Sequence, residues 1–557
     1  MTAFHKPPQV DGDGQLIRIG PPLLRQEPDA CPAGRALRAR PLLVQWPKRT
    51  RSEPVKTFSF APWGNLLDAV ERDGASLMEA VADPENTRRC ADAHVRWAEE
   101  AASTYLAARA REQSVRSAAG YPATRPVRRQ WVGVDQLRAP DGRGADRYER
   151  TAWGRQYASE DGSLREIWIP SMASVKRDRP MPEIAAAAHV AATGVPAELP
   201  YGERARLSER PGIEPRRVRV IGVGLGDGST QVLADWDVAE AKRHFDEHAK
   251  ARMTRAVDGR GTRPGQDCAR CEALSGCSDL PRVSGLLGAH APRRPRKRRS
   301  VSVSDLRVYR DCPARYHLTR VLKLRDAEAE NQAIRRGRAV DAWLNERHAA
   351  SPRTPCRYAP LPDSLPGLSA AELPAALAMI RHHRGRCPLD GLAPDETVEP
   401  QRRVVGYDTQ TDVVVIADCD LVYTDRGGVV IRETKTASHR FGERRELVRT
   451  YPQLALAVLL MASDTFGGDP RRSRIELEVL REDGARLEEI DPFDASTLDQ
   501  SRRVITELAA RWVADETYNP APAEDFDCAD CEARRWCTAA RTLPRDRAIR
   551  GTREADR

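Results

Sequence analysis

Residues 413–438 read VVVIADCDLVYTDRGGVVIRETKTAS, and this stretch decides the fold of the second half of the chain. Two β-branched, apolar runs flank the turn sequence DRGG, a pattern typical of a β-hairpin. Alternate side chains of a strand point to one face, so Glu433 and Lys435 share a face of the second strand. Asp420 lies on the first strand. The sequence therefore predicts a hairpin that gathers two carboxylates and one ammonium group.

These side chains suit the hydrolysis of a phosphodiester with a bound divalent cation. Asp420 and Glu433 offer the hard oxygen ligands that Mg²⁺ or Mn²⁺ prefers, and the backbone carbonyl of Thr434 adds another. Lys435 is then placed to orient the attacking water or to stabilise charge on the phosphate. The alternative is a solvated strand surface with an ion pair, which an Asp followed by Glu-x-Lys does not exclude by itself.

Twelve cysteines form the second informative pattern. The N-terminus lacks the profile of a secretory signal, so we expect a cytoplasmic protein whose cysteines bind metal rather than form disulfides. Cys528, Cys531 and Cys537 have CxxCx5C spacing, and Cys312 is the candidate fourth ligand. Four thiolates suit zinc or a 4Fe-4S cluster, so ligand chemistry leaves both open. The other cysteines of the second half stand alone and are expected to fill the core: Cys356, Cys387 and Cys419.

Four landmarks of the second half recur in the first half in the same order, which predicts an internal duplication. The pairs are DACPAGRALR (29–38) with RDCPARYHLTR (310–320), MPEIAAAAHVAA (181–192) with YPQLALAVLLMA (451–462), RVRVIGVGLGDGSTQVL (217–233) with SRIELEVLREDGARLEEI (473–490), and CARCEALSGC (268–277) with CADCEARRWC (528–537). The duplication predicts a second cysteine quartet of Cys31, Cys268, Cys271 and Cys277, in which Cys90 is the alternative to Cys31.

The first copy lacks part of the catalytic pattern. Its segment RQYASEDGSLREIWIPSMAS (155–174) aligns with the hairpin of the second half, and Glu166 matches Glu433. Trp168 falls at the position of the lysine, and Gln156 lies close to that of the aspartate. We therefore expect a degenerate domain without catalytic activity, with nucleic-acid binding as its residual task. Three aromatic residues either stack on bases or, as we prefer, fill the core: Trp153, Tyr157 and Trp168.

A basic stretch, AHAPRRPRKRRS at residues 289–300, divides the chain into domains of residues 1–288 and 301–557. Proline and consecutive like charges favour a solvated linker there. The net charge of +9 and the pI near 9.0 favour a polyanionic partner, although an arginine-rich genome composition would explain the same excess. No apolar run is long enough to cross a bilayer, and no Walker A sequence supports an ATP-driven motor.

The start of the second half resembles a known family. VSVSDLRVYRDCPARYHL (301–318), together with the late cysteine cluster, is similar to the opening of RecB-like and AddB-like nucleases of the PD-(D/E)XK superfamily. This resemblance implies a 4Fe-4S cluster on Cys312 and the three C-terminal cysteines. It further implies that RRGRAVDAWLNERH (335–348) is the family's GxxxH helix, with Asp341 in place of the metal-binding histidine.

A second helix of the family is also matched in part. RTYPQLALAVLL (449–460) is similar to the QxxxY helix, in which Gln453 would help to position the substrate and the active-site groups. Ala457 replaces the tyrosine of that motif.

Taken with the duplication, the resemblance implies an α/β fold of two tandem restriction-endonuclease-like (PD-(D/E)XK) domains. Each has a mixed central sheet flanked by helices, and the first is degenerate. The expected function is a Mg²⁺- or Mn²⁺-dependent DNA nuclease, in particular an exonuclease, in DNA repair or in defence against foreign DNA. DNA and a helicase, or another repair or defence protein, are the expected partners. The rival functions are a non-catalytic iron–sulfur scaffold that binds DNA or a helicase, and a zinc-stapled binding protein.

Overall fold

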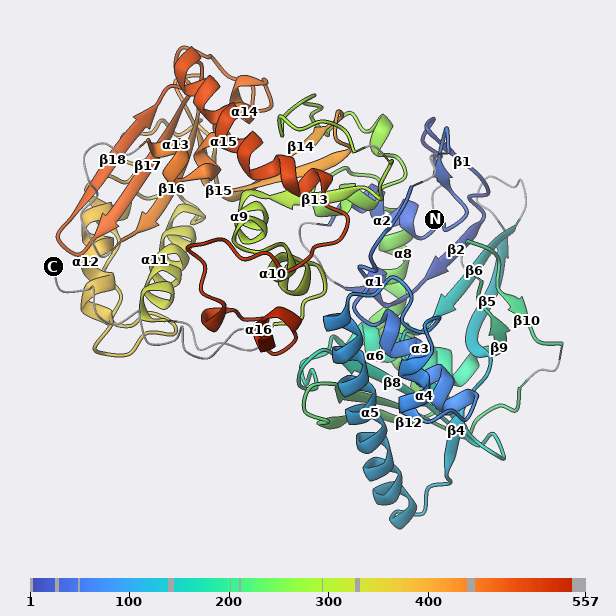
Figure 1. The fold of residues 1–557 in the computed structure, drawn as a ribbon. Helices are drawn as coiled ribbons and strands as arrows, with labels where there is room; N and C mark the ends of the chain where they lie inside the picture. The colour runs from blue at the N-terminus through green and yellow to red at the C-terminus, as the bar shows by residue number, and fades with distance from the viewer. Residues whose placement is uncertain are drawn as a thin grey trace.

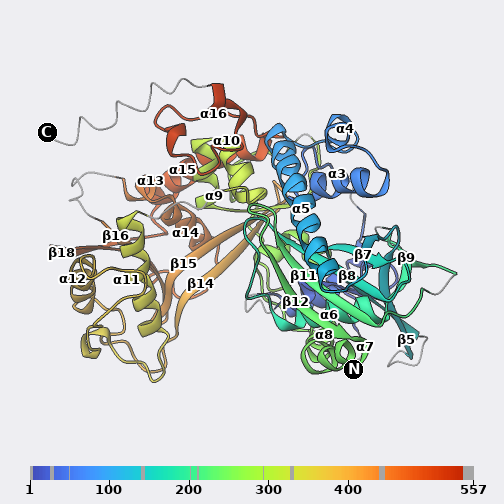
Figure 2. The same ribbon diagram turned by 90° about the horizontal axis from the view of Figure 1, so that it is seen from below.

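A computed structural model of the protein describes residues 4–25, 30–48, 51–138, 145–200, 202–209, 212–292, 294–325, 331–437 and 446–542. The first half of the chain, in blue to green, and the second half, in yellow to red, form two lobes that lie side by side (Figure 1). Figure 2 shows the same two lobes from below. No helix in the described part of the chain is long and apolar enough to span a membrane.

A six-stranded mixed sheet forms the centre of the second half. Its strands are β13 (Arg299–Ser302), β14 (Val398–Asp408), β15 (Val413–Asp425), β16 (Gly428–Thr436), β17 (Arg474–Arg481) and β18 (Gly484–Ile490). The order is β13-β15-β16-β17-β18, with β14 paired to β15. The β13–β15 and β16–β17 pairs are parallel, whereas the other three pairs are antiparallel. The segment quoted first therefore forms the expected hairpin at the centre of this sheet.

Helices cover both faces of this sheet because the strands alternate apolar side chains between them. Ile475, Leu477 and Val479 of β17 belong to a core with three helices, whereas Leu480 belongs to a separate core with two others. The first set is α9 (Val303–Asp311), α14 (Pro452–Ala462) and α15 (Ala495–Ala514); the second is α11 (Gln332–His348) and α12 (Leu373–Arg384). The yellow and orange helices on either side of the sheet are visible in Figure 1.

The first half contains two five-stranded sheets. One has the order β10-β9-β5-β6-β2, from β2 (Leu16–Ile19), β5 (Gln130–Arg138), β6 (Ala145–Thr151), β9 (Val195–Glu198) and β10 (Arg206–Leu207). The other has the order β12-β11-β8-β7-β4, from β4 (Thr124–Pro126), β7 (Arg155–Ser159), β8 (Leu164–Ser171), β11 (Arg217–Gly224) and β12 (Thr230–Asp237). Helix α6 (Met181–Thr193) packs against strands of both sheets. Its run of alanines allows this burial, because large side chains would keep the two sheets apart.

Part of the second half repeats in the first. The order of β7–β8 hairpin, α6, β11 and β12 matches the order of β15–β16 hairpin, α14, β17 and β18. In both copies the second hairpin strand pairs in parallel with a later strand, β8 with β11 and β16 with β17, and that strand pairs antiparallel with the next. In the first half β9 and β10 come between α6 and β11. The predicted α/β fold class, with mixed sheets flanked by helices, is confirmed.

The two halves share buried surface. Trp97 of α5 (Asp92–Ala118) lies in one apolar core with Leu318, Ala533 and Trp536 of the second half, and α5 lies beside this C-terminal segment in Figure 2. All of the basic stretch at 289–300 except position 293 lies within the described residues. Its last residues begin strand β13, and two of its arginines are buried, Arg296 and Arg298. This part of the stretch packs into the fold rather than extending into solvent.

Candidate functional site

Strand β15 changes its neighbour at the position of Asp420. One side of β15 pairs with β14, whereas the other side pairs with β13 as far as Ile416 and with β16 from Leu421 onward. The sheet therefore opens on that side at residues 417–420. Leu421 pairs with Arg432, so one further step of the antiparallel register places Asp420 opposite Glu433.

The residues predicted from the hairpin meet at this opening. Lys435 Nζ lies 2.9 Å from Glu433 Oε2 and 3.4 Å from Asp420 Oδ2. It also donates to the carbonyl oxygen of Thr434 at 3.2 Å, while the Thr434 N–H donates to Asp420 Oδ2 at 2.9 Å. The structure thus brings two carboxylates, a carbonyl and an ammonium group within reach of one ion or phosphate.

The electrostatics of this cluster favour a bound cation. Burial, reinforced by the charge of Asp420, raises the pKa of Glu433 to about 7. Burial lowers the pKa of Lys435, but the charges of Glu433 and Asp420 outweigh it, so the net shift is upward. Two carboxylates with one cationic partner leave an excess of negative charge, which a divalent metal ion would neutralise.

Helix α11 brings a third carboxylate toward the hairpin. A Cβ atom at Gly337 would lie 2.8 Å from Thr436 Oγ1, so glycine permits the close approach of α11 to β16. Asp341 lies one turn further along the helix and accepts a hydrogen bond from Asn345 at 3.1 Å. Burial, together with the charge of Asp420, raises the pKa of Asp341. Asp341 is therefore an electrostatic neighbour of the acidic pair, as the family's GxxxH position implies.

Gln453 is not joined to this group. It lies half-buried in the first turn of α14, and no hydrogen bond within the described part of the chain links it to Asp420, Glu433 or Lys435. Its predicted role in positioning groups at the site remains a prediction.

Polar side chains of the protein surround the equivalent glutamate of the first half. Glu166 is fully buried and accepts hydrogen bonds from Arg116, from Thr124 Oγ1 at 3.0 Å and from Trp168 Nε1 at 3.4 Å. Arg219 forms a further ion pair with it at 3.4 Å. Side chains of the protein therefore satisfy this carboxylate, in contrast to Glu433.

The strand register corrects one detail of the sequence alignment. Tyr157, rather than Gln156, lies opposite Glu166, because the turn between β7 and β8 shifts the pairing by one residue. Gln156 instead accepts a hydrogen bond from the Trp131 N–H at 2.8 Å. Tyr157 and Trp168 are fully buried, so the preferred core interpretation holds for both. Neither ring is available for stacking on a base.

Removing the carboxylate of Glu166 is expected to destabilise the first half. Glu166→Ala leaves Arg116 as a buried charge without its main partner, which costs about 3–5 kcal/mol of unfolding free energy. Urea unfolding followed by tryptophan fluorescence would measure the loss, because Trp168 lies beside the substituted residue. Glu160→Ala, at an exposed position of the same hairpin, is the control. An equal midpoint for both variants would contradict the structural role of Glu166.

The C-terminal cysteine quartet draws on both ends of the second half. Cys312 is buried between α9 and α10 (Pro313–Tyr316), whereas the CxxCx5C cysteines lie in a 3₁₀ turn and the loop before α16 (Thr538–Thr542). Burial, followed by the nearby thiols of Cys312 and Cys537, raises the pKa of Cys528. Burial also raises the pKa of Cys531 to about 11. A metal centre would reverse these shifts because it stabilises the thiolate.

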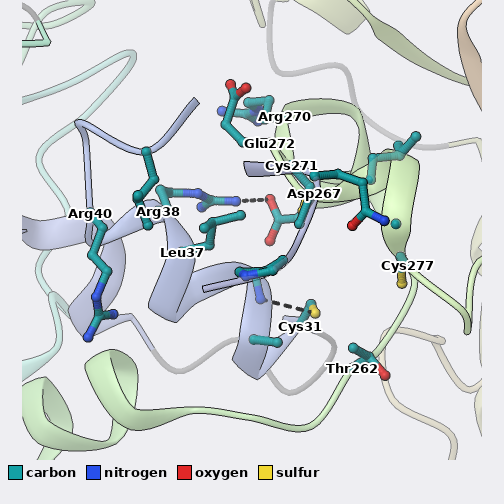
Figure 3. Close-up of a pocket in the computed structure, with 18 of the residues that line it drawn as sticks. Cys31, Leu37, Arg38, Arg40, Thr262, Asp267, Arg270, Cys271, Glu272 and Cys277 are labelled. Atoms are coloured by element: carbon teal, nitrogen blue, oxygen red, sulfur yellow. Dashed lines mark hydrogen bonds and ion pairs between the residues drawn. The ribbon is translucent and has the colours of Figure 1, made fainter. Parts of the chain in front are cut away.

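The first-half quartet lines one cavity of about 1190 Å³: Cys31, Cys268, Cys271 and Cys277. Figure 3 shows Cys31, Cys271 and Cys277 in this cavity. Cys31 Sγ accepts hydrogen bonds from the backbone N–H groups of Gly34 at 3.3 Å and Arg263 at 3.4 Å. The Gly265 N–H donates to Cys268 Sγ at 3.3 Å. Such bonds stabilise the thiolates of iron–sulfur centres. The alternative ligand Cys90 lines a different pocket, which Cys537 also lines, so the structure favours Cys31.

The spacing of the thiols bears on which metal the quartets suit. Neither quartet is among the groups of described residues whose ligand atoms all lie within 4.8 Å of one another. A single tetrahedral zinc ion, with Zn–S bonds of about 2.3 Å, requires sulfur atoms roughly 3.8 Å apart. The choice between zinc and a 4Fe-4S cluster therefore stays a prediction at both quartets.

Another cluster of histidine and cysteine side chains escaped the sequence analysis. Cys356 and Cys387 do not stand alone as expected: their ligand atoms and those of His348 and His383 all lie within 4.8 Å of one another. Cys419 is buried on β15, outside this group. The H-x3-C spacing of residues 383–387 was the available signal, but the other two ligands lie about thirty residues earlier without a recognisable pattern.

Comparison with known proteins gives a family match in the second half. Residues 300–538 match the PD-(D/E)XK nuclease superfamily, a segment that contains Asp341, the β15–β16 hairpin and the C-terminal cysteine quartet. The C-terminal region therefore contains a PD-(D/E)XK domain, of a superfamily whose members are nucleases. No curated protein matches the sequence. Among solved structures, the crystal structure of SSO0001 aligns at 17% identity over 43% of this chain and 86% of that chain, with a TM-score of 0.23.

Proposed function

We propose that the second half of this chain is a DNA nuclease that requires Mg²⁺ or Mn²⁺, with its active site at Asp420, Glu433, Thr434 and Lys435. The observation that supports this most directly is the position of Lys435 between two carboxylates. They lie where the neighbour of β15 changes from β13 to β16. This cluster lies inside the segment that matches the nuclease superfamily. A surface ion pair explains the cluster less well, because Glu433 is buried. Removing its charge from water costs free energy that an ion pair alone does not readily recover.

Each residue of the cluster has a distinct task in this proposal. Asp420, Glu433, Asp341 and the Thr434 carbonyl hold the cation through oxygen, as Mg²⁺ and Mn²⁺ prefer. A cation held there would supply Lewis-acid chemistry for the phosphoryl group and would activate a water for attack. Lys435 keeps its ammonium group beside the carboxylates, where it orients the attacking water and balances the charge that develops on the phosphate.

The remaining predictions extend this proposal to the whole chain. We infer a RecB-like or AddB-like exonuclease with a 4Fe-4S cluster on Cys312, Cys528, Cys531 and Cys537, and a second cluster on the first-half quartet. The first domain, residues 1–288, would bind DNA without cleaving it, since Glu166 is sealed by arginines and a tryptophan occupies the position of the lysine. A helicase or another protein of DNA repair or defence would supply or unwind the substrate.

DNA cleavage by the anaerobically purified full-length protein tests the proposed function. We expect Mg²⁺ or Mn²⁺ to support degradation of labelled linear DNA, single- or double-stranded, and a chelator to abolish it. A covalently closed circle of the same sequence separates the two modes of attack. Its survival would support an exonuclease, and its cleavage would contradict that part of the proposal. Inactivity on every substrate would favour the non-catalytic scaffold.

Asp341 is expected to set the affinity for the catalytic metal. Asp341→Ala removes one oxygen ligand, so the Mg²⁺ concentration for half-maximal activity should rise by at least about tenfold. Asp341→His should raise the ratio of Mn²⁺- to Mg²⁺-supported activity, because imidazole binds Mg²⁺ poorly. Metal titrations of the cleavage rate measure both effects, with Glu346→Ala, exposed on the same helix, as the control. Unchanged metal dependence in Asp341→Ala would exclude Asp341 from the site.

A further inference from the structure

We propose that His348, Cys356, His383 and Cys387 bind a structural zinc ion, at a site separate from the hairpin and from both cysteine quartets. One ligand atom from each of these residues lies within 4.8 Å of all the others. All four side chains are buried, with exposures of 5%, 0%, 0% and 4%. These four residues are called the Cys2His2 group below.

The histidines of the Cys2His2 group are oriented as metal ligands. Nδ1 of His383 is held by the carboxylate of Glu478, at 2.8 Å and 3.0 Å from its two oxygens. Nε2 of His383 is buried and has no hydrogen bond of ordinary geometry among the described residues. Nε2 of His348 lies 3.8 Å from Cys387 Sγ. A carboxylate on one ring nitrogen, with the other nitrogen facing thiols, is the usual arrangement around a zinc-bound histidine.

An unpartnered nitrogen at this position is otherwise costly. A buried polar atom without a hydrogen bond loses the interaction it would have with water, and a metal–nitrogen bond would remove that cost for His383 Nε2. Two thiolates and two imidazoles complete the tetrahedral shell that zinc prefers, with no position left for water or substrate. The inferred role is therefore structural rather than catalytic.

The ion would join three elements that the chain brings together from distant positions. His348 ends α11, Cys356 begins the 3₁₀ turn Cys356–Tyr358, and His383 and Cys387 lie at the end of α12 and just beyond it. Glu478, which holds His383, lies on β17, and the same strand pairs with β16 of the hairpin. The site thus fastens the pair of helices to the central sheet.

This fastening reaches the helix that carries Asp341. Residues 341 and 348 are two helical turns apart and share one face of α11, separated by about 10 Å along its axis. The same helix approaches β16 at Gly337, where an added Cβ atom would lie 2.8 Å from Thr436 Oγ1. Fixing the end of α11 therefore limits how far Asp341 can move from the acidic pair.

Zinc content of the intact protein tests the proposal without reference to activity. Elemental analysis of the anaerobically purified full-length chain should show about one equivalent of zinc fewer in Cys387→Ser and in Cys356→Ser than in wild type, with iron unchanged. Cys419→Ser is the matched control, since this cysteine is equally buried in the same half but outside the group. Equal zinc in wild type and Cys387→Ser would overturn the proposal.

Two measurements remain decisive if the cysteine variants fail to fold. Zinc-edge X-ray absorption of iron-loaded wild type should show two sulfur atoms at about 2.3 Å and two nitrogen atoms at about 2.0–2.1 Å. An all-sulfur shell, or a Cys356–Cys387 disulfide in a non-reduced peptide map, would overturn the proposal. Glu478→Gln keeps all four ligands and should weaken zinc affinity about 10–100-fold in chelator competition. Unaltered affinity would contradict the proposed orientation of His383.

Discussion

Replacing Lys435 with methionine is expected to lower the rate of DNA cleavage by about 10²–10³-fold, the effect of losing one group that stabilises transition-state charge. Methionine keeps the length of the side chain but removes the ammonium group that contacts Glu433 and Asp420. The loss should fall on kcat, because the lysine acts on charge that develops during the reaction rather than on DNA binding. Single-turnover cleavage at saturating Mg²⁺ measures it.

Folding of this variant must be separated from chemistry. Lys435→Met leaves Asp420 and Glu433 facing each other without a cation, so the metal-free protein should melt at a lower temperature. Mg²⁺ should restore the melting temperature but not the rate. Lys250→Met, an exposed lysine of the first half paired with Asp246, serves as the control for charge removal. Wild-type kcat in Lys435→Met would exclude this lysine from the mechanism.

Replacing Cys312 with serine is expected to remove one cluster equivalent of iron and to loosen the whole second half. This cysteine lies near the start of the domain and the other three near its end, so a metal that they share would close a loop of more than two hundred residues. Metal binding of this kind contributes directly to folding free energy. The C-terminal segment also packs on α5 of the first half through Trp536 and Trp97, so contact between the halves should weaken.

Iron content, visible absorbance and limited proteolysis measure these effects in the anaerobically purified protein. Cys419→Ala is the control, because this cysteine is buried outside the quartet. Unchanged iron in Cys312→Ser would remove Cys312 from the ligand set. Zinc in place of iron in wild type would instead support the zinc-stapled rival. New cleavage sites near α16 in Cys312→Ser, absent from the control, would support the predicted loosening.

Local patterns carried much of the prediction. The β15–β16 hairpin follows from β-branched runs around a glycine turn, and the common face of Glu433 and Lys435 follows from the two-residue repeat of a strand. The cysteine spacing is also visible in the sequence, because the three cysteines of each CxxCx5C motif lie within ten residues of one another. These features depend on neighbours in the chain, so a single sequence is enough to reveal them.

The pairing of residues across the β7–β8 turn was predicted less accurately from the sequence. The alignment placed Gln156 near the position of the aspartate, whereas the β7–β8 register places Tyr157 opposite Glu166. A shift of one residue reverses the face of every side chain, and only the hydrogen bonds between the strands decide it. The ion pairs of Glu166 with Arg116 and Arg219 could not be predicted either, since those arginines come from other elements.

The sequence by itself determined the hairpin with its acidic pair and lysine, the two cysteine spacings and the repeated order of elements. Only the tertiary structure decided which distant residues meet. His348 and Cys356 reach His383 and Cys387 because α11 and α12 pack together on the sheet, and Arg298 is buried against Asp412. Such contacts depend on the packing of whole helices and strands, for which no short pattern in the chain exists.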